Sequence, residues 1–409
     1  MEYVVTATSP FVNGEARLLI GEAGFTVASR DGAADVFFAD VNELAQTDQS
    51  VLVRADSGDW VFTRLGRWRE PIWQAVSAAY NAAVARSLFV SGAPIVTVDG
   101  SYRLVEGDDV ASGAATIEIH DDCVVALPPN LDARRVPFAF VDGVGHGEYD
   151  LSLRIGADQY SYAKLGYGTE PFRLAVEKQL RAAGERSLTA VRSVDPSLST
   201  SLATVVARHM PFGSAAPLDR LEAVAPSFAR ALRQAWKESP AGGSFEQFLQ
   251  LCGLPRIWLG FAATGDGWRA EKNDRAGVWA QLLGGDSLSS AAAPFVPWLV
   301  ASSPDGGSAA VEFAEDDAAT YVYRADGDFP GFAGLVSRAL EAVAFSRDAI
   351  RLSDQELLQP QYADYRMAAK RTAALRYVRS HFAGRVIHSS PGAWRRRLME
   401  LWDTGERWC

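Results

Sequence analysis

The residue types that most often carry chemistry are sparse in this 409-residue sequence. Five histidines and three cysteines are spread along the chain, and only His120 and Cys123 lie close together. A structural zinc site needs four such ligands, usually arranged as two close pairs, and no second pair follows. We therefore interpret His120 as an exposed turn residue and Cys123 as a buried strand residue, and we expect no metal site.

Motifs for nucleotides and for hydrolysis are also missing from the sequence. The run GVGHGE at 143–148 is rich in glycine, but its spacing differs from a dinucleotide-binding loop and a strand pattern, DLSLRI, follows it. Neither a Gly-x-x-x-x-Gly-Lys-Ser/Thr run nor a Gly-x-Ser-x-Gly run occurs. We therefore expect no cofactor and assign no catalytic residue. An enzyme with its site between folding units remains an alternative, because catalytic groups can come from distant parts of a sequence.

Basic residues form the clearest grouping of charge, and they lie near the C-terminus. The formal net charge is −10, yet Arg and Lys outnumber Asp and Glu over 352–409. On a helix, three of these residues fall broadly on one side and apolar residues on the other. The candidate contacts to an anionic partner are Arg366, Lys370, Arg376, Arg395, Arg396 and Arg397.

This basic tail has two interpretations. An amphipathic basic helix can dock on an anionic membrane surface or on nucleic acid. Alternatively, its apolar side packs on the rest of the same chain, which is acidic, and its arginines are solvated or paired. We favour the second interpretation, because attraction within the chain is the simplest use of the opposite charges.

Composition limits the class of protein. Hydrophobic residues make up 48% of the chain and charged residues 22%, which is typical of a folded soluble protein. Three scattered cysteines indicate no disulfide framework, and the first residues lack the pattern of a signal peptide. The longest apolar stretch, 291–301, is too short to cross a bilayer. We therefore expect a cytoplasmic protein.

An internal repeat sets the architecture. Residues 60–88 and 160–188 are identical at 11 of 29 paired positions, including Leu-Gly, Glu-Pro and Arg-Ser-Leu. Upstream of each segment, runs of 4–8 residues rich in Val, Phe and Leu alternate with Gly, Asp and Ser turns, which predicts short antiparallel strands. Copy two has an additional strand pattern in front, at 94–106.

Each copy ends in a predicted amphipathic helix. Apolar residues recur at spacings of 4, 4 and 3 after the Glu-Pro pair, as one stripe of a helix requires. A fainter third copy has the same stripe, with a first hairpin at 257–270, a third strand at 277–283, a long loop at 284–307 and a tyrosine hairpin after it. The three stripes are Ile72, Val76, Tyr80 and Ala83; Phe172, Val176, Leu180 and Ala183; and Phe332, Val336, Leu340 and Val343.

These patterns predict five regions. We expect repeat units at 1–90, 91–190 and 256–350, with a helical insert at 191–255 and a basic helical tail at 351–409. The predicted class is α+β, in which each unit is a small curled antiparallel sheet or open barrel capped by a C-terminal helix.

The motif LG(x)3EP(I/F), at 65–72 and 165–172, together with the order of strands and closing helix, resembles tandem pleckstrin-homology-like (PH-like) repeats of uncharacterised actinobacterial-type proteins. The resemblance covers roughly 240 of the 409 residues. It implies a binding or scaffolding module. Lipid-binding relatives place Lys and Arg around the first hairpin loop, whereas the corresponding runs here read GEAG, HDD and TGDG. These acidic or neutral runs argue against inositol lipids.

We therefore expect a non-enzymatic cytoplasmic scaffold that binds a protein or peptide, either along an open sheet edge or beside a closing helix. The alternative is a peripheral binder of anionic membranes or nucleic acid that acts through the basic tail alone. An enzyme with a site between units is the third alternative.

Overall fold

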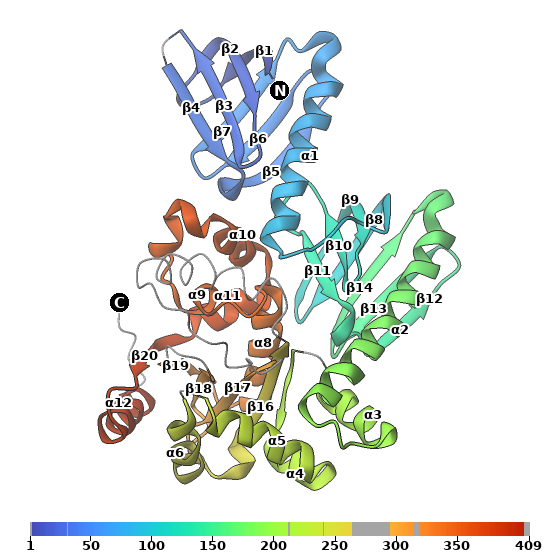
Figure 1. The fold of residues 1–409 in the computed structure, drawn as a ribbon. Coiled ribbons are helices and arrows are strands. Elements are labelled where there is room, and N and C mark those ends of the chain that lie inside the picture. Colours follow the sequence, from blue (N-terminus) through green and yellow to red (C-terminus); the bar gives the residue numbers. More distant parts are fainter. Residues whose placement is uncertain are drawn as a thin grey trace, which may run out of the picture. The chain divides into compact units, whose positions relative to one another are not determined.

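The computed structural model describes residues 2–30, 32–211, 213–239, 241–263, 295–314 and 319–404. It contains helices and three antiparallel sheets, so the predicted α+β class is confirmed (Figure 1).

The chain divides into two compact units. The first comprises the residues up to Leu180 together with Leu352–Ala373, and the second comprises Arg181–Arg351 and the residues from Ala374 onward. The region predicted as one tail, 351–409, is thus shared between the two units.

The first sequence copy folds into a seven-stranded sheet with the spatial order β4-β3-β2-β1-β7-β6-β5, followed by helix α1. The first strand was not predicted. Its outward position Val4 is apolar and exposed, so the polar alternation typical of a half-buried strand is weak. The elements are β1 (Glu2–Thr8), β2 (Asn13–Ile20), β3 (Gly24–Ser29), β4 (Gly32–Phe37), β5 (Val41–Gln46), β6 (Val51–Ala55), β7 (Gly58–Thr63) and α1 (Arg69–Ser87).

The second copy has the same strand order, β11-β10-β9-β8-β14-β13-β12, followed by helix α2. Its register also matches: Cys123 pairs with Pro137 where the first copy pairs Gly24 with Phe37. The elements are β8 (Val96–Glu106), β9 (Asp109–Ile119), β10 (Cys123–Leu127), β11 (Arg134–Pro137), β12 (Gly143–His146), β13 (Asp150–Ile155), β14 (Asp158–Ala163) and α2 (Thr169–Val194).

The repeated Leu-Gly pair forms the turn into each closing helix. Leu65 and Leu165 are buried, and the glycines after them, Gly66 and Gly166, have φ angles of +50° and +57°. Glycine adopts this left-handed conformation without the steric cost that a Cβ atom imposes. The motif therefore joins a core anchor to a turn that favours glycine. Beyond it, the predicted stripes lie on the inner side of α1 and α2, where all members are buried except the partly buried Leu180.

Over its described residues, the second unit contains a six-stranded sheet whose spatial order follows the sequence, β15 to β20. Its strands are β15 (Ala215–Pro217), β16 (Ile257–Ala263), β17 (Phe295–Ser302), β18 (Ser308–Phe313), β19 (Ala319–Arg324) and β20 (Phe382–Ile387). The described helices after α2 are α3 (Thr200–His209), α4 (Leu218–Val224), α5 (Pro226–Lys237), α6 (Gly242–Cys252), α8 (Phe329–Ala342), α9 (Arg347–Arg351), α10 (Ala363–Arg371), α11 (Ala373–Ser380) and α12 (Pro391–Thr404), of which α10 belongs to the first unit.

This sheet differs from the two copies that it was predicted to repeat. Its order is sequential, the predicted loop at 284–307 contains β17, and its outer strands β15 and β20 come from the predicted insert and tail. The expected helical stripe does lie buried in and directly after α8. The predicted strand at 277–283 and the turn TGDG at 264–267 fall outside the described residues.

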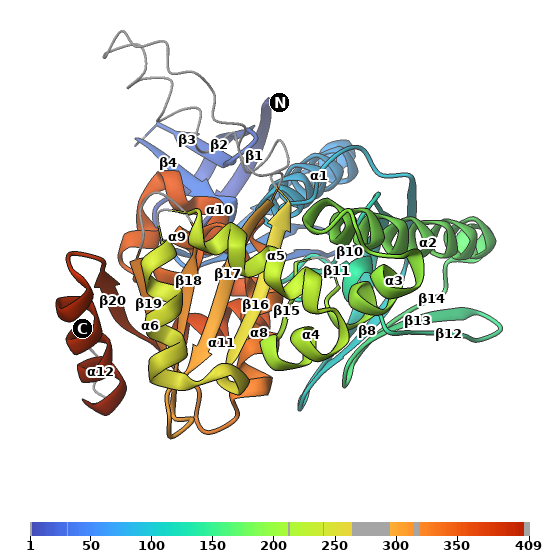
Figure 2. The same cartoon turned by 60° about the horizontal axis from the view of Figure 1, so that its bottom comes forward.

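Helices cover both faces of this sheet (Figure 2). On one face Phe261 of β16 contacts Phe228 of α5, with ring centroids 6.2 Å apart. On the other face Tyr323 of β19 contacts Phe332 of α8, at 5.8 Å. Strand β20, which comes from the tail, is an edge strand of this sheet. Among the described helices, none is both long enough and apolar enough to pass through a bilayer.

Candidate interaction sites

The first part of the basic tail packs against the first sequence copy, within the first unit. Arg366 forms an ion pair with Asp40 at 2.8 Å, and the Lys370 ammonium lies 2.7 Å from Asp56. Burial alone would raise the pKa of Asp56, but hydrogen bonds from Lys370 and Asn42 hold the pKa below its usual value. Both basic residues are therefore already matched with carboxylates of their own chain.

Arg371 is fully buried at the same place and connects three segments of the first unit. Its guanidinium donates to the Met367 carbonyl at 3.2 Å and to the Tyr80 hydroxyl at 2.7 Å, and lies over the Tyr80 ring at 5.6 Å. The Tyr80 hydroxyl in turn donates to the Asn130 carbonyl at 3.1 Å. Helix α10, helix α1 and the loop between β10 and β11 are thereby joined through one phenol.

The other predicted basic contacts lie in the second unit, so the structure does not gather the six residues into one site. Arg376 is on α11, and the three consecutive arginines are on α12. Helix α12 buries its apolar side, which includes Trp394 and Leu398. Arg395 and Arg396 are exposed, whereas Arg397 donates to Glu400 at 2.9 Å.

One edge of the first sheet is occupied by the second copy. Strand β5 is the last strand in its sheet, and its Leu44 N–H donates to the Pro129 carbonyl at 2.7 Å. Glu43 and Asn130 form an antiparallel bridge beside this bond. The 128–133 loop therefore contacts the sheet edge through one backbone hydrogen bond and one isolated bridge.

Two consecutive prolines make this loop available. In the first copy the β3–β4 hairpin still pairs Ser29 with Gly32 at its tip, but in the second copy pairing stops at Ala126 with Arg134. Pro128 and the proline after it have no N–H to donate, so the ladder cannot continue. The open loop was not predicted, although the run PPN at 128–130 is a sequence signal for it.

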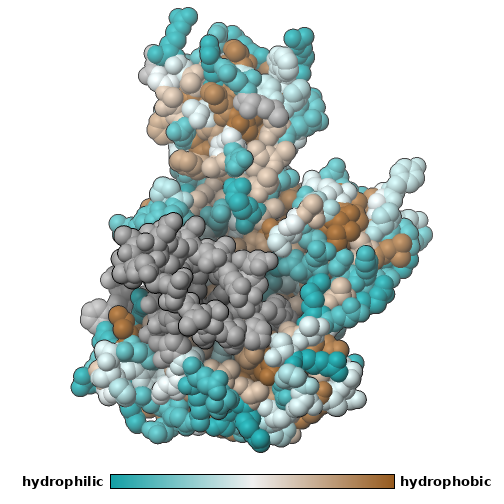
Figure 3. Space-filling view, in the orientation of Figure 1, coloured by the Kyte–Doolittle hydropathy of each residue, from teal (hydrophilic) through white to brown (hydrophobic). Residues whose placement is uncertain are grey.

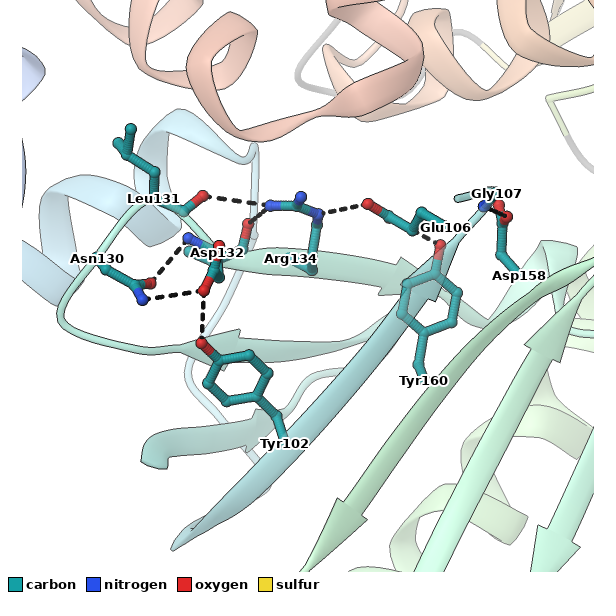
Figure 4. Close-up of polar contacts among 10 residues, drawn as sticks. Tyr102, Glu106, Gly107, Asn130, Leu131, Asp132, Arg134, Asp158 and Tyr160 are labelled. Atoms are coloured by element: carbon teal, nitrogen blue, oxygen red, sulfur yellow. Dashed lines mark hydrogen bonds and ion pairs between the residues drawn. The ribbon is translucent and has the colours of Figure 1, made fainter. Parts of the chain in front are cut away.

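Hydrogen bonds within the second copy fix the shape of this loop (Figure 4). Asp132 accepts from the Tyr102 hydroxyl at 2.8 Å and from the Asn130 side chain at 2.9 Å, and its own N–H donates to the Asn130 side-chain oxygen at 2.8 Å. Burial and the neighbouring Asp132 raise the pKa of Tyr102 to about 12, so this hydroxyl stays a donor at neutral pH.

A second polar group flanks the loop and distinguishes the two copies. Glu106 accepts from Arg134 at 2.9 Å and from the Tyr160 hydroxyl at 3.1 Å (Figure 4). In the first copy an apolar contact replaces the hydrogen bond between Glu106 and Tyr160. Phe11 stacks on Trp60 there, with ring centroids 6.1 Å apart. The two copies share a topology but close the same end of the sheet with different chemistry.

The edge equivalent to β5 in the second copy is β12, and its register is the same. Val144 pairs with Leu153 as Leu44 pairs with Val53. The Gly147 N–H donates to the backbone carbonyl of Asp150. Hydrogen-bonded and non-hydrogen-bonded pairs alternate along an antiparallel ladder. Counting back from Gly147, Val144 belongs to a non-hydrogen-bonded pair, so its N–H points away from β13. Within the described ranges β12 pairs with β13 alone, and the Val144 side chain is 38% exposed.

The predicted interpretation of His120 is wrong. Its side chain is buried, and its Nε2 lies 3.1 Å from a carboxylate oxygen of Glu118, which supplies a polar partner inside the fold. Cys123 is buried as expected, and no group of side chains in the described part of the chain could hold a metal.

The runs GEAG and HDD are not the first hairpin turns of their copies. They join β2 to β3 and β9 to β10, so they are the second turns. The first turns are at 9–12 and 107–108, and these contain no Lys or Arg.

A buried polar cluster in the second unit was not predicted. The fully buried Glu312 accepts from Ser244 and from Thr320, the latter at 2.6 Å, and His388 lies 3.2 Å away. The Ser244 hydroxyl donates to this carboxylate, and both side chains are buried. This cluster ties α6, β18 and β19 to the segment before α12. Only folding brings its members together, so no spacing in the sequence could reveal it.

The chain matches no protein-family model, and a search of curated proteins finds no similar sequence.

Proposed function

We propose that the chain is a non-enzymatic interaction protein built from PH-like modules, and that it binds an extended peptide segment of a partner along β12. The PH-like assignment is supported by the strand order that both copies share and by the helix that closes each sheet.

The observation that carries the proposal is the hydrogen bond from Leu44 to Pro129. It is an example, inside this chain, of a backbone segment from outside the module that hydrogen-bonds to the module's outer strand. Val144 occupies the same register on β12. Main-chain hydrogen bonds at a sheet edge supply affinity, and the pockets for alternate side chains supply specificity.

A display experiment tests the proposal. Random peptides displayed on phage are selected against the full chain and then tested against Val144→Pro and Val144→Thr. Proline removes the outward N–H but leaves the β12–β13 ladder intact, whereas threonine keeps the N–H. Selected peptides should bind the wild-type chain and Val144→Thr and lose binding to Val144→Pro. Equal binding to all three proteins contradicts the proposal.

A further inference from the structure

The outer face of the second sheet is covered by the closing helix of the first copy. Cys123, Val125 and Leu127 alternate along β10, so their side chains share one face, and all are buried. They belong to the same core cluster as Tyr80 and Val84 of α1. One copy therefore packs its helix on the outer face of the next copy.

The equivalent face of the first sheet carries no such helix within the described residues. Thr26 of β3 occupies the position that corresponds to Val125 of β10. Thr26 pairs with Leu19 on one neighbouring strand and with Asp35 on the other. Val125 pairs with Glu118 and Arg135 in the same way. Strands β2 to β4 there enclose an open hollow of about 660 Å³. Two large apolar side chains lie in it and are exposed, Leu19 at 40% and Phe37 at 51%. In Figure 3, apolar surface gathers over this part of the first copy.

The charged residues that line the hollow are all acidic. Its charged lining residues are Glu2, Glu22 and Asp35, and no basic residue lines it. Asp35 accepts from Thr26 at 2.6 Å, and Glu2 pairs with Arg17 at 3.3 Å, so the carboxylates stand at the rim of the apolar floor. Exposed apolar surface bordered by one sign of charge favours a partner with the opposite sign.

We propose that this face of β2–β4 is a docking site for an amphipathic helix of a partner protein, with an apolar stripe flanked by Lys or Arg. The helical form follows from the α1–β10 packing at the equivalent face. The basic flanks follow from the carboxylates of Glu22 and Asp35, because Glu2 is already paired with Arg17. The site is separate from the β12 edge and does not depend on it.

The test uses two designed amphipathic helical peptides, one of Leu and Lys and one of Leu and Glu, titrated into the full chain and followed by fluorescence anisotropy. The Leu/Lys peptide should bind the wild-type chain, more weakly as salt is raised, and the Leu/Glu peptide should not. Phe37→Ser should weaken binding about tenfold, as the loss of one buried aromatic contact predicts.

The matched control is Val4→Ser, which removes an apolar side chain that is 63% exposed on the same face but outside the hollow. It should bind like the wild type. Equal effects of the two substitutions, or equal binding of both peptides, overturn the proposal. Self-association of the chain that Phe37→Ser abolishes would also overturn it, because the occupant would then be a second copy.

Discussion

Tyr80 and Arg371 are 291 residues apart in the sequence, and the guanidinium of one donates to the hydroxyl of the other at 2.7 Å. The same hydroxyl donates to Asn130. A single phenol thus joins the tail helix, the closing helix of the first copy and the loop that lies on its sheet edge. The basic tail is therefore part of the fold over the residues that belong to the first unit.

Tyr80→Phe should destabilise the first unit by about 1–3 kcal/mol, because a buried guanidinium loses its side-chain acceptor and a buried carbonyl loses its donor. The measurement is urea unfolding followed by hydrogen exchange of α1 peptides. Tyr149→Phe is the control, since that side chain is exposed, and it should have no effect. If the two variants unfold alike, Tyr80 does not join these segments.

The ion pair between Lys370 and Asp56 should make stability depend on acidity. The pKa of Asp56 is lowered in the folded state, so its contribution is present above its unfolded value of 3.8 and is lost as pH falls through the lower folded value. The free energy of unfolding of the wild type should exceed that of Asp56→Asn at neutral pH, and the difference should shrink below pH 3.8. In a Lys370→Met background the difference should be smaller at neutral pH. A difference that is the same at every pH contradicts the assignment.

Asp132→Ala should release the 128–133 loop from its position, because Tyr102 and Asn130 both lose their acceptor. Since the Leu44 N–H is held by Pro129 in this loop, its exchange with solvent should become faster. Amide hydrogen exchange resolved to single residues measures this. Asp109→Ala, at an exposed position of the same copy, should leave the Leu44 rate unchanged. If Asp132→Ala leaves it unchanged as well, the polar cluster does not hold the loop.

The tail arginines should divide into two classes. Arg366→Ala should lower stability by about 1 kcal/mol, because its partner Asp40 is largely shielded from solvent. The double substitution Arg395→Ala with Arg396→Ala should not lower stability, since both side chains are exposed.

Sedimentation with phosphatidylserine vesicles tests the alternative function, in which the tail binds an anionic membrane. Binding that the double substitution abolishes would establish a membrane role for α12 and contradict a purely structural tail.

Local patterns predicted the parts of the fold that depend on neighbouring residues. The stripe of Val76 and Tyr80 was predicted because helix periodicity acts over a few residues. Strand β20 was not, since FAGRVI is short and its pairing partner β19 lies far away in the sequence. The candidate sites were harder still. Whether Arg371 would be exposed or buried depends on the docking of α10 on α1, which no local pattern encodes.

The most direct test of the proposed function is amide exchange at Val144, compared with Leu44, in the full chain with and without a selected peptide. Without peptide, Leu44 should be protected by Pro129 and Val144 should exchange freely. With peptide, protection at Val144 should rise to that of Leu44. A peptide that binds but leaves the exchange of Val144 unchanged would contradict strand addition at β12.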